Sequence, residues 1–275
     1  MVFLIKIRVR SHWARMNIFK GGGGIKLPNL NDTLQRLKSD HVASDKKESN
    51  VCPKCNGTTW IITRGEDGRE YGKPCECRNK VIATAIMQNC GITPEDQRKG
   101  FKDFNTFGEK ALVHAKQVAM SYFQMFRGDY HTRINSLLLS GASGRGKTML
   151  GLAVANNLMN MSIRVRYMAY RDEMTALKQN IVDEYAYNER INRLKNASVL
   201  FIDDLLKGKI TESDVNILYE IVNYRYLQRL PMIISTEKTI EELINFDEAI
   251  GSRIAEMSKD YVITFDASVP NYRLR

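Results

Sequence analysis

The chain has 275 residues, of which 43% are hydrophobic and 26% charged, and this composition excludes a fibrous or wholly disordered protein. No apolar run approaches the ~20 residues that a membrane-spanning helix needs. Lys6 and Arg8 interrupt the first apolar stretch too early for a signal peptide. We therefore expect a soluble, cytoplasmic protein with no membrane partner.

The formal net charge of +10 is concentrated near the N-terminus. Residues 1–50 carry a net charge of +6, whereas residues 101–275 carry only +2. A basic arm is suited to nucleic acid or to an acidic partner surface, although a solvated tail explains it equally well. Within this arm and linker, four glycines at 21–24 predict a flexible joint, and leucines at helical spacing predict a short amphipathic helix over 31–40.

Two close pairs of cysteines follow, separated by nineteen residues. Two such pairs can converge on one tetrahedral Zn²⁺, and four thiolates leave no open position, so we predict a structural zinc site. A strand is expected over 58–63 and a turn over 65–68, which makes 51–80 a zinc-ribbon-like domain that depends on metal for much of its stability. Unligated thiols are the alternative, and disulfides are disfavoured inside cells. The predicted ligands are Cys52, Cys55, Cys75 and Cys77.

A helical connector is predicted over 81–107. The pattern favours a helix over 79–90 that Gly91 ends, and Thr93 has the position of an N-cap before a proline and acidic residues. Cys90 is expected to be a packed thiol and not a fifth ligand. Three aromatic residues at three-residue spacing then predict core, with the wall of an adenine pocket as the alternative; they are Phe101, Phe104 and Phe107.

A long helix is predicted over 109–126, and a nucleotide motif follows it. Residues 136–140 predict a buried strand and 149–159 a helix, and between them Gly-Ala-Ser-Gly-Arg-Gly-Lys-Thr fits the phosphate-loop pattern G-x-x-x-x-G-K-[ST]. Glycines let the backbone curl around an anion at a helix N-terminus, while Lys147 reaches the β- and γ-phosphates and Thr148 ligates Mg²⁺. The predicted nucleotide-binding residues are Gly141, Ala142, Ser143, Gly144, Arg145, Gly146, Lys147, Thr148 and Met149.

Strands and helices alternate through the rest of the chain. Buried strands that alternate with helices form parallel sheets covered on both faces, so 108–275 predicts an α/β domain with a five-stranded parallel sheet. Thr211 with Asp214, and Thr239 with Glu242, predict two helix starts as capping boxes. The other strands are expected over 164–169, 198–203, 231–235 and 261–265, and residues 171–195 are expected to be helical and charged.

Asp203 and Asp204 end a hydrophobic strand and form a second nucleotide motif. In phosphoryl transfer one such carboxylate holds Mg²⁺ and the next can orient the attacking water, so we assign Asp203 to the metal and Asp204 to the water. The alternative is that these two aspartates only cap a helix or turn that follows the strand. The strand over 231–235 also runs into polar residues, one of which could sense the γ-phosphate. Thr236 is preferred, with Ser235 and Glu237 as alternatives.

Arg253 follows a glycine and a serine on a later predicted helix. An arginine in such a place can reach the nucleotide of a neighbouring subunit and stabilise charge in the transition state. A surface ion pair is the alternative. The predicted catalytic residues are therefore Lys147, Asp203, Asp204, Thr236 and Arg253.

Together these motifs resemble those of the AAA+ ATPases, and residues 90–275 resemble the DnaC/DnaI-type loaders of bacterial and phage replicative helicases. The Gly-Ser-Arg segment is what narrows the resemblance from P-loop NTPases in general to these loaders. The cysteine cluster is similar to the zinc-containing, helicase-binding domain of some members. Only ten residues follow the last predicted strand, which agrees with the missing C-terminal helical lid of that family. The segments that carry the resemblance are 91–94, 101–104, the phosphate loop, 201–204, 231–236 and 248–253.

The resemblance implies an ATP-dependent loader of a hexameric replicative helicase onto single-stranded DNA during replication initiation. It implies a homo-oligomer on the helicase, held by the N-terminal region, with ATP, Mg²⁺ and Zn²⁺ as cofactors. Two strand ends depart from the family pattern: the second motif ends in Asp-Asp where Asp-Glu is commoner, and the strand over 231–235 runs into Ser-Thr-Glu where an Asn is often found. These departures predict weak ATPase activity that DNA or the partner modulates. Candidate contacts to DNA phosphates are Lys178, Arg190, Arg193, Lys207 and Lys209.

Two other functions stay open at this point. A transposition helper ATPase shares the same core and also binds DNA, although the zinc cluster favours the loader. A non-hydrolysing adaptor could instead bind and inhibit a helicase. A GTPase is disfavoured because no Asn-Lys-x-Asp motif occurs, and a small-molecule kinase is disfavoured because nothing indicates an acceptor pocket with a mobile lid.

Overall fold

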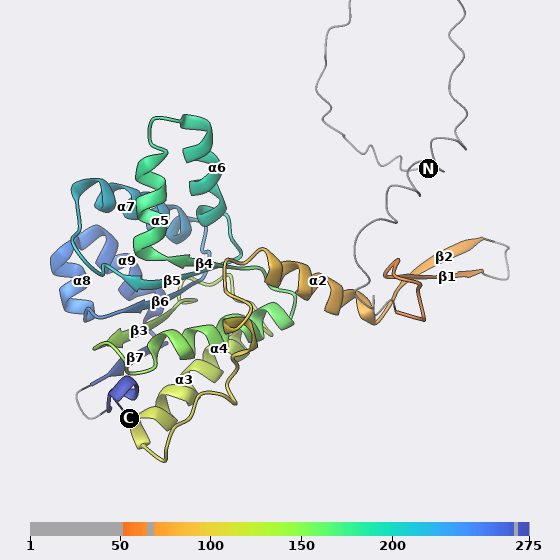
Figure 1. The fold of residues 1–275 in the computed structure, drawn as a ribbon, viewed down its shortest axis with the longest axis horizontal. Helices are drawn as coiled ribbons and strands as arrows, with labels where there is room; N and C mark the ends of the chain where they lie inside the picture. The colour runs from red at the N-terminus through yellow and green to blue at the C-terminus, as the bar shows by residue number, and fades with distance from the viewer. Residues whose placement is uncertain (1–51, 65–68, 267–268, 275) are drawn as a thin grey trace, which may run out of the picture. The chain divides into compact units, whose positions relative to one another are not determined.

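The computed structural model describes residues 52–64, 69–266 and 269–274, which all belong to one compact unit, Cys52–Arg275 (Figure 1). The predicted arm with its helix over 31–40 and the predicted turn over 65–68 lie outside the described residues. Within the described ranges, no helix combines the length and the apolar character that crossing a membrane requires.

In the described part of the chain, five strands form one parallel sheet in the order β4-β5-β6-β3-β7, which confirms the predicted fold (Figure 1). Side chains alternate between its faces, so that Leu137 and Leu139 pack on one side and Leu138 on the other. The strands are β3 (Leu137–Gly141), β4 (Val165–Ala169), β5 (Val199–Leu205), β6 (Met232–Thr236) and β7 (Val262–Phe265).

Helices cover both faces of the sheet, and each face has its own buried apolar cluster. On one face, α3 (Lys110–Met125) and α4 (Lys147–Asn160) contribute Leu112 and Leu150. Both predicted capping boxes are present, at the starts of α7 (Glu212–Leu227) and α8 (Ile240–Phe246). The other face is covered by α5 (Tyr170–Gln179), α6 (Glu184–Lys195), α7 (Glu212–Leu227), α8 (Ile240–Phe246) and α9 (Glu248–Ser258).

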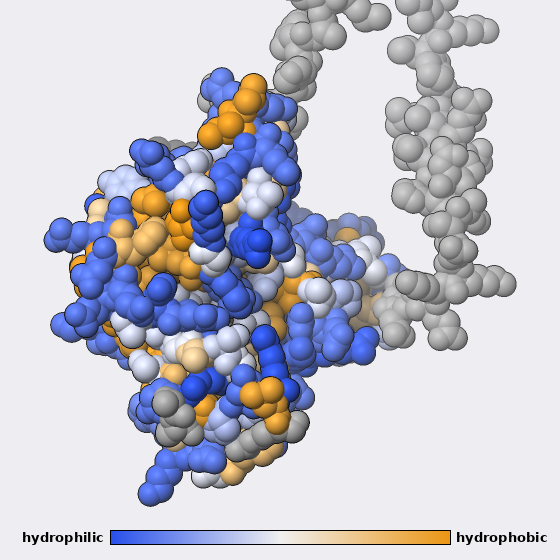
Figure 2. Space-filling model, turned by 60° about the vertical axis from the view of Figure 1, so that its left-hand side comes forward, coloured by the Kyte–Doolittle hydropathy of each residue, from blue (hydrophilic) through white to orange (hydrophobic). Residues whose placement is uncertain are grey.

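The segment 171–195 is helical, as predicted, except for a turn that divides it into two helices. A short turn separates α5 from α6, because Asp183 caps α6 by accepting a hydrogen bond from the Ala186 amide at 3.0 Å. In this turn Ile181 is 57% and Val182 94% exposed. Apolar side chains accordingly gather at the tip of the α5–α6 pair (Figure 2).

The connector differs from its prediction in two places. The helix expected after Thr93 is only a 3₁₀ turn, Asp96–Arg98, although the Thr93 hydroxyl does accept a hydrogen bond from an amide of that turn at 3.2 Å. Phe104 is buried and Phe101 packs against α3, as expected for core. Phe107 is half exposed, so the core prediction was wrong for this residue, whose backbone turns at φ +47°.

The cysteine-bearing segment consists of β1 (Trp60–Arg64) paired antiparallel with β2 (Glu70–Pro74), followed by α2 (Cys77–Gln88). β1 confirms the predicted strand, shifted by a residue or two. α2 packs against α4 and runs across the predicted domain boundary at residue 80. The cysteine cluster and the connector therefore share a helix.

Candidate nucleotide and zinc sites

The phosphate loop joins β3 to α4 as the sequence predicted. Three of its glycines, Gly141, Gly144 and Gly146, have positive φ angles, which give the backbone the curl that an anion cradle needs. Gly146 is the N-cap of α4 at φ +92°, and a Cβ there would lie 3.1 Å from the Phe104 ring. The loop thus presents a helix N-terminus to a cavity of about 260 Å³ that Asp204 also lines.

Lys147 is the first residue of α4 and is only 5% exposed. Its Nζ donates a hydrogen bond to the Ala142 carbonyl at 2.9 Å, so the side chain folds over the loop. Burial lowers the pKa of this ammonium, while the nearby carboxylates of Glu237 and Asp204 oppose the shift. A cation withdrawn from water at this position attracts phosphate oxygens more strongly than one in open water.

Asp203 lies near the end of β5, is only 6% exposed and accepts hydrogen bonds from three hydroxyl groups. Its Oδ1 accepts from Thr148 Oγ1 at 2.9 Å and from Ser235 Oγ. Its Oδ2 accepts from the Tyr167 hydroxyl at 2.9 Å. The structure therefore brings the two predicted nucleotide motifs together, and the hydroxyl and carboxylate oxygens of Thr148 and Asp203 are the hard ligands that Mg²⁺ prefers.

Asp204 has a different environment because the register of β5 against β6 shifts beside it. The residue adopts φ +56°, and its amide donates a hydrogen bond to Ser235 Oγ at 2.9 Å. Its side chain is 39% exposed and lines the cavity, where Lys207 Nζ donates to Oδ2 at 2.9 Å. A carboxylate in this position can orient a water molecule or accept its proton.

The polar residues at the end of β6 face different neighbours. Ser235 contacts both aspartates of the second motif. The fully buried Thr236 hydroxyl donates instead to the Leu205 carbonyl at 2.9 Å, and Glu237 forms an ion pair with Lys207. Ser235, the predicted alternative, is thus the side chain that lies between the two motifs, because β6 lies between β3 and β5. Contact of Thr236 with a γ-phosphate stays a prediction.

Arg253 lies on α9, as predicted, with its guanidinium over the Tyr219 and Tyr226 rings at 5.5 and 5.3 Å from their centres. Its Nη1 donates a hydrogen bond to the Ala249 carbonyl at 2.6 Å. Arg253 is not among the described residues that line the cavity beside the phosphate loop. Contact between Arg253 and the nucleotide of a neighbouring copy stays a prediction.

The sequence reasoning missed residues that line the same cavity. The segment after β7 ends in a 3₁₀ turn, Tyr272–Leu274, which folds back over the phosphate loop. The Tyr272 amide donates to the Gly144 carbonyl at 2.9 Å, and Arg273 Nη1 lies 3.5 Å from Ser143 Oγ. The only signal for these residues in the sequence was an aromatic side chain next to a basic one, Tyr272 and Arg273, in a short polar segment. The missed cavity-lining residues include Asp96, Lys99, Tyr272 and Arg273.

The basic residues predicted to contact DNA fall into two groups. Lys178, Lys207 and Lys209 line one hollow of about 130 Å³ together with Arg171. The other two candidates lie on α6. The ion pairs of Arg193 and Lys207 are exposed on both sides, and surface ion pairs contribute only ~0–1 kcal/mol, so these two can exchange for phosphate contacts. The carboxylates that pair with Lys178 and Arg190 are buried. The carboxylate partners are Asp214 for Lys178, Glu173 for Arg190, Glu189 for Arg193 and Asp204 for Lys207.

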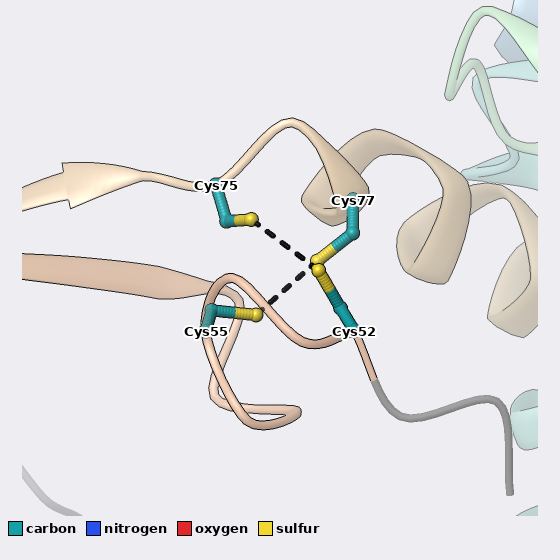
Figure 3. Close-up of side chains that lie close together, drawn as sticks. All are labelled: Cys52, Cys55, Cys75 and Cys77. Atoms are coloured by element: carbon teal, nitrogen blue, oxygen red, sulfur yellow. Dashed lines mark hydrogen bonds between the residues drawn. The ribbon is translucent and has the colours of Figure 1, made fainter.

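The four cysteine sulfurs converge, with all Sγ atoms within 4.8 Å of one another (Figure 3). Four ligands at ~2.3 Å around a tetrahedral Zn²⁺ would be ~3.8 Å apart, so the set fits that ion. Burial opposes ionisation of the Cys55 thiol, but hydrogen bonds from Cys77 and from backbone amides outweigh it and lower its pKa to about 7. The Sγ atoms of Cys52 and Cys75 are 3.8 Å apart, and those of Cys55 and Cys77 are 3.4 Å apart.

Comparisons with known proteins agree with this geometry. A model of the IstB-like ATP binding proteins matches residues 97–254. The chain is 34% identical to the phage-like element PBSX protein XkdC of Bacillus subtilis, over 84% of this chain and 90% of that protein. It is 26% identical to the replicative helicase loader DnaC of Escherichia coli, over 84% of this chain and 89% of that protein.

The fold has solved neighbours as well. A crystal structure of DnaI superposes with a TM-score of 0.54 at 21% identity, and the match covers 64% of this chain and 95% of that one. The family match spans more than half of the chain and includes the phosphate loop, both aspartates of the second motif and Arg253. The chain therefore belongs to the IstB-like ATP binding protein family, among AAA+ proteins of the DnaC/DnaI type.

Proposed function

We propose that this chain is an ATPase that loads a hexameric replicative helicase onto single-stranded DNA. The observation that carries the proposal is the hydrogen bond between Thr148 and Asp203, which joins the phosphate loop to the second motif within an ATP-binding family. A relative along most of the chain is itself a replicative helicase loader, which supports this function.

Each residue of the site has a role in the proposed reaction. Lys147 and the loop amides would hold the β- and γ-phosphates, and Thr148 with Asp203 would hold Mg²⁺, which neutralises charge on the transferred phosphoryl group. Asp204 would orient the attacking water. Ser235 would keep the two aspartates in register through its bonds to both. Hydrolysis is expected to be slow without DNA or partner.

Other parts of the chain would provide the surfaces that contact the helicase, DNA and neighbouring copies. The cysteine cluster with β1, β2 and α2 would bind the helicase, because it is separate from the nucleotide cavity. The hollow lined by Lys178, Lys207 and Lys209 would neutralise DNA phosphates. Neighbouring copies on the helicase would complete each ATP site, with Arg253 acting in trans.

Nucleotide binding is the first test. Lys147→Ala should weaken binding of a fluorescent ATP analogue in Mg²⁺ by about tenfold or more, since a charge-assisted contact to phosphate is lost. Lys110→Ala is the matched control, because Lys110 is an exposed lysine on α3. If Lys147→Ala binds and hydrolyses ATP as the unchanged protein does, the site is assigned wrongly.

Loading is the second test. The purified chain and a replicative helicase of its host should form an ATP-dependent complex that places the helicase on circular single-stranded DNA. Retention of a transposase in place of the helicase would favour the transposition helper. Helicase binding without any ATP turnover would favour the non-hydrolysing adaptor.

A further inference from the structure

Tyr167 contacts the metal-site carboxylate from a strand that has no nucleotide motif. Of the three hydroxyls that bond Asp203, two lie in the phosphate loop and at the end of β6, and both bond Oδ1. The third belongs to Tyr167 on the edge strand β4 and bonds Oδ2 at 2.9 Å. This hydrogen bond fixes the rotation of the carboxylate, because it holds the oxygen that the other two leave free.

The ring of Tyr167 is itself held in place. It meets the Phe201 ring edge-to-face, with centroids 5.3 Å apart, and Phe201 is fully buried against Gly151 of α4. The hydroxyl of this fixed ring donates its hydrogen bond to the carboxylate oxygen at 2.9 Å.

The backbone of Tyr167 is bonded to the segment that follows α2. Its amide donates to the Cys90 carbonyl at 2.7 Å. Gly91 has φ +86°, and a Cβ there would lie 3.2 Å from the Tyr167 carbonyl oxygen, so this segment passes close along the edge strand. α2 begins at Cys77, one of the four converging cysteines.

Side-chain hydrogen bonds join the end of α2 to the segment after it. Gln97 donates to the Met87 carbonyl at 2.7 Å and to the Ile92 carbonyl at 2.8 Å. Asn156 of α4 in turn donates to the carbonyls of Asp96 and Lys99, at 2.7 and 2.6 Å. Residues 89–99, which follow α2, are thus hydrogen-bonded both to α2 and to α4. Tyr167 connects this segment to the second motif, because its amide bonds Cys90 and its hydroxyl bonds Asp203.

We propose that Tyr167 is a positioning residue that orients Asp203 for the metal–nucleotide complex and links that carboxylate to the segment after α2. The inference rests on the proposed ATP site. It adds a chain of contacts that runs from Asp203 through Tyr167 and α2 to the four cysteines. Removing a group that hydrogen-bonds a metal ligand commonly weakens metal binding by about 10–100-fold. Coupling of this kind is reciprocal, so metal and nucleotide should also tighten the β4 contact.

The first experiment compares Tyr167→Phe with Tyr187→Phe. Tyr187 is the matched control, because its hydroxyl also donates to a carboxylate, that of Glu220 at 3.2 Å, and it lies on α6. Binding of a fluorescent ATP analogue is titrated with Mg²⁺, and again in EDTA. Tyr167→Phe should need about tenfold more Mg²⁺ for half-saturation while its affinity in EDTA stays unchanged. An Mg²⁺ requirement equal to that of the unchanged protein would overturn the positioning role.

The second experiment measures amide hydrogen exchange at Tyr167, whose N–H is bonded to Cys90. Mg²⁺ with a non-hydrolysable ATP analogue should slow this exchange in the unchanged protein and in Tyr187→Phe, but not in Tyr167→Phe. Equal slowing in all three would overturn the link to the segment after α2. Failure of the ATP-site assignment looks different, since the unchanged protein would then bind no nucleotide in either experiment.

Discussion

Two adjacent aspartates at the end of β5 have opposite environments, and their proposed roles follow from this difference. Asp203 is buried and bonded by three hydroxyls, which suits a metal ligand whose geometry must not vary. Asp204 turns at a positive φ and extends into the cavity with one ion pair to Lys207. A carboxylate that remains partly solvated keeps access to water, which the attacking nucleophile requires.

Asp204→Asn should therefore separate turnover from binding. We expect ATP turnover to fall by about 100-fold, because the amide cannot accept the proton of the attacking water, while nucleotide affinity changes by less than about threefold. Steady-state phosphate release and analogue binding measure the two quantities. Asp172→Asn, an exposed change on α5, is the control. Undiminished turnover would contradict the role of Asp204.

Gly151 allows α4 to pack closely on the sheet. A Cβ at this position would lie 2.5 Å from Phe201 Cζ, and Phe201 is fully buried, so its ring cannot retreat. Gly151→Ala should lower the free energy of unfolding by ~1–3 kcal/mol through overpacking, although alanine gains ~1 kcal/mol in helix propensity. Urea unfolding measures the change. In a Phe201→Leu background the penalty should shrink, and an equal penalty in both backgrounds would contradict this cause.

At the scale of elements, the β1–β2 pair has too little apolar burial to be stable by itself. Three of its large apolar side chains, Trp60, Ile62 and Tyr71, are exposed, whereas Cys55 and Cys75 are buried. An isolated two-stranded pair is marginal in water, so the cysteine cluster has to supply the stability of this segment. The exposed apolar side chains also make the pair suited to contact a partner.

Zinc removal should consequently unfold β1 and β2 and leave the parallel sheet folded. Cys77→Ser should lose the bound zinc, measured by elemental analysis, and the amides of β1 and β2 should exchange rapidly. Cys90→Ser should keep its zinc, because Cys90 is buried outside the cluster. Full retention of slow exchange in β1 and β2 after zinc removal would show that the metal is not structural.

At the scale of the whole molecule, the arginine proposed to complete the nucleotide site does not line the cavity of its own chain. Arg253 lies on α9 against tyrosines of α7, and the residues that line the nucleotide cavity come from elsewhere. A head-to-tail ring of identical copies would present this arginine to the next nucleotide site, and such heterologous contacts close into rings when the rotation permits.

Mixing two inactive variants tests this arrangement. Arg253→Ala and Asp204→Asn should each be nearly inactive on the helicase, since an arginine supplied in trans is worth about 10³–10⁵ in rate. An equimolar mixture should regain activity, because about a quarter of head-to-tail interfaces then pair an intact arginine with an intact aspartate. Phosphate release in the presence of helicase measures it. A mixture no more active than its components would contradict a role in trans.

The local parts of the fold and of the nucleotide site could be predicted from the sequence. Glycines that permit positive φ, a lysine and threonine at fixed offsets, and capping boxes at Thr211 and Thr239 all act within a few residues, so their spacing is sufficient. The order of apolar strands and helices likewise determined a parallel sheet. The turn between α5 and α6 was not predicted, because residues 180–182 contain neither glycine nor proline to mark it.

Only the tertiary structure decided which side chains meet at Asp203. Strand order places β6 between β3 and β5, so Ser235 and not Thr236 contacts both aspartates. It also brings Tyr167 to the carboxylate from the edge strand and folds the 3₁₀ turn that contains Tyr272 over the phosphate loop. These contacts join residues far apart in the chain, and sequence spacing carries no information about neighbours that sheet topology alone brings together.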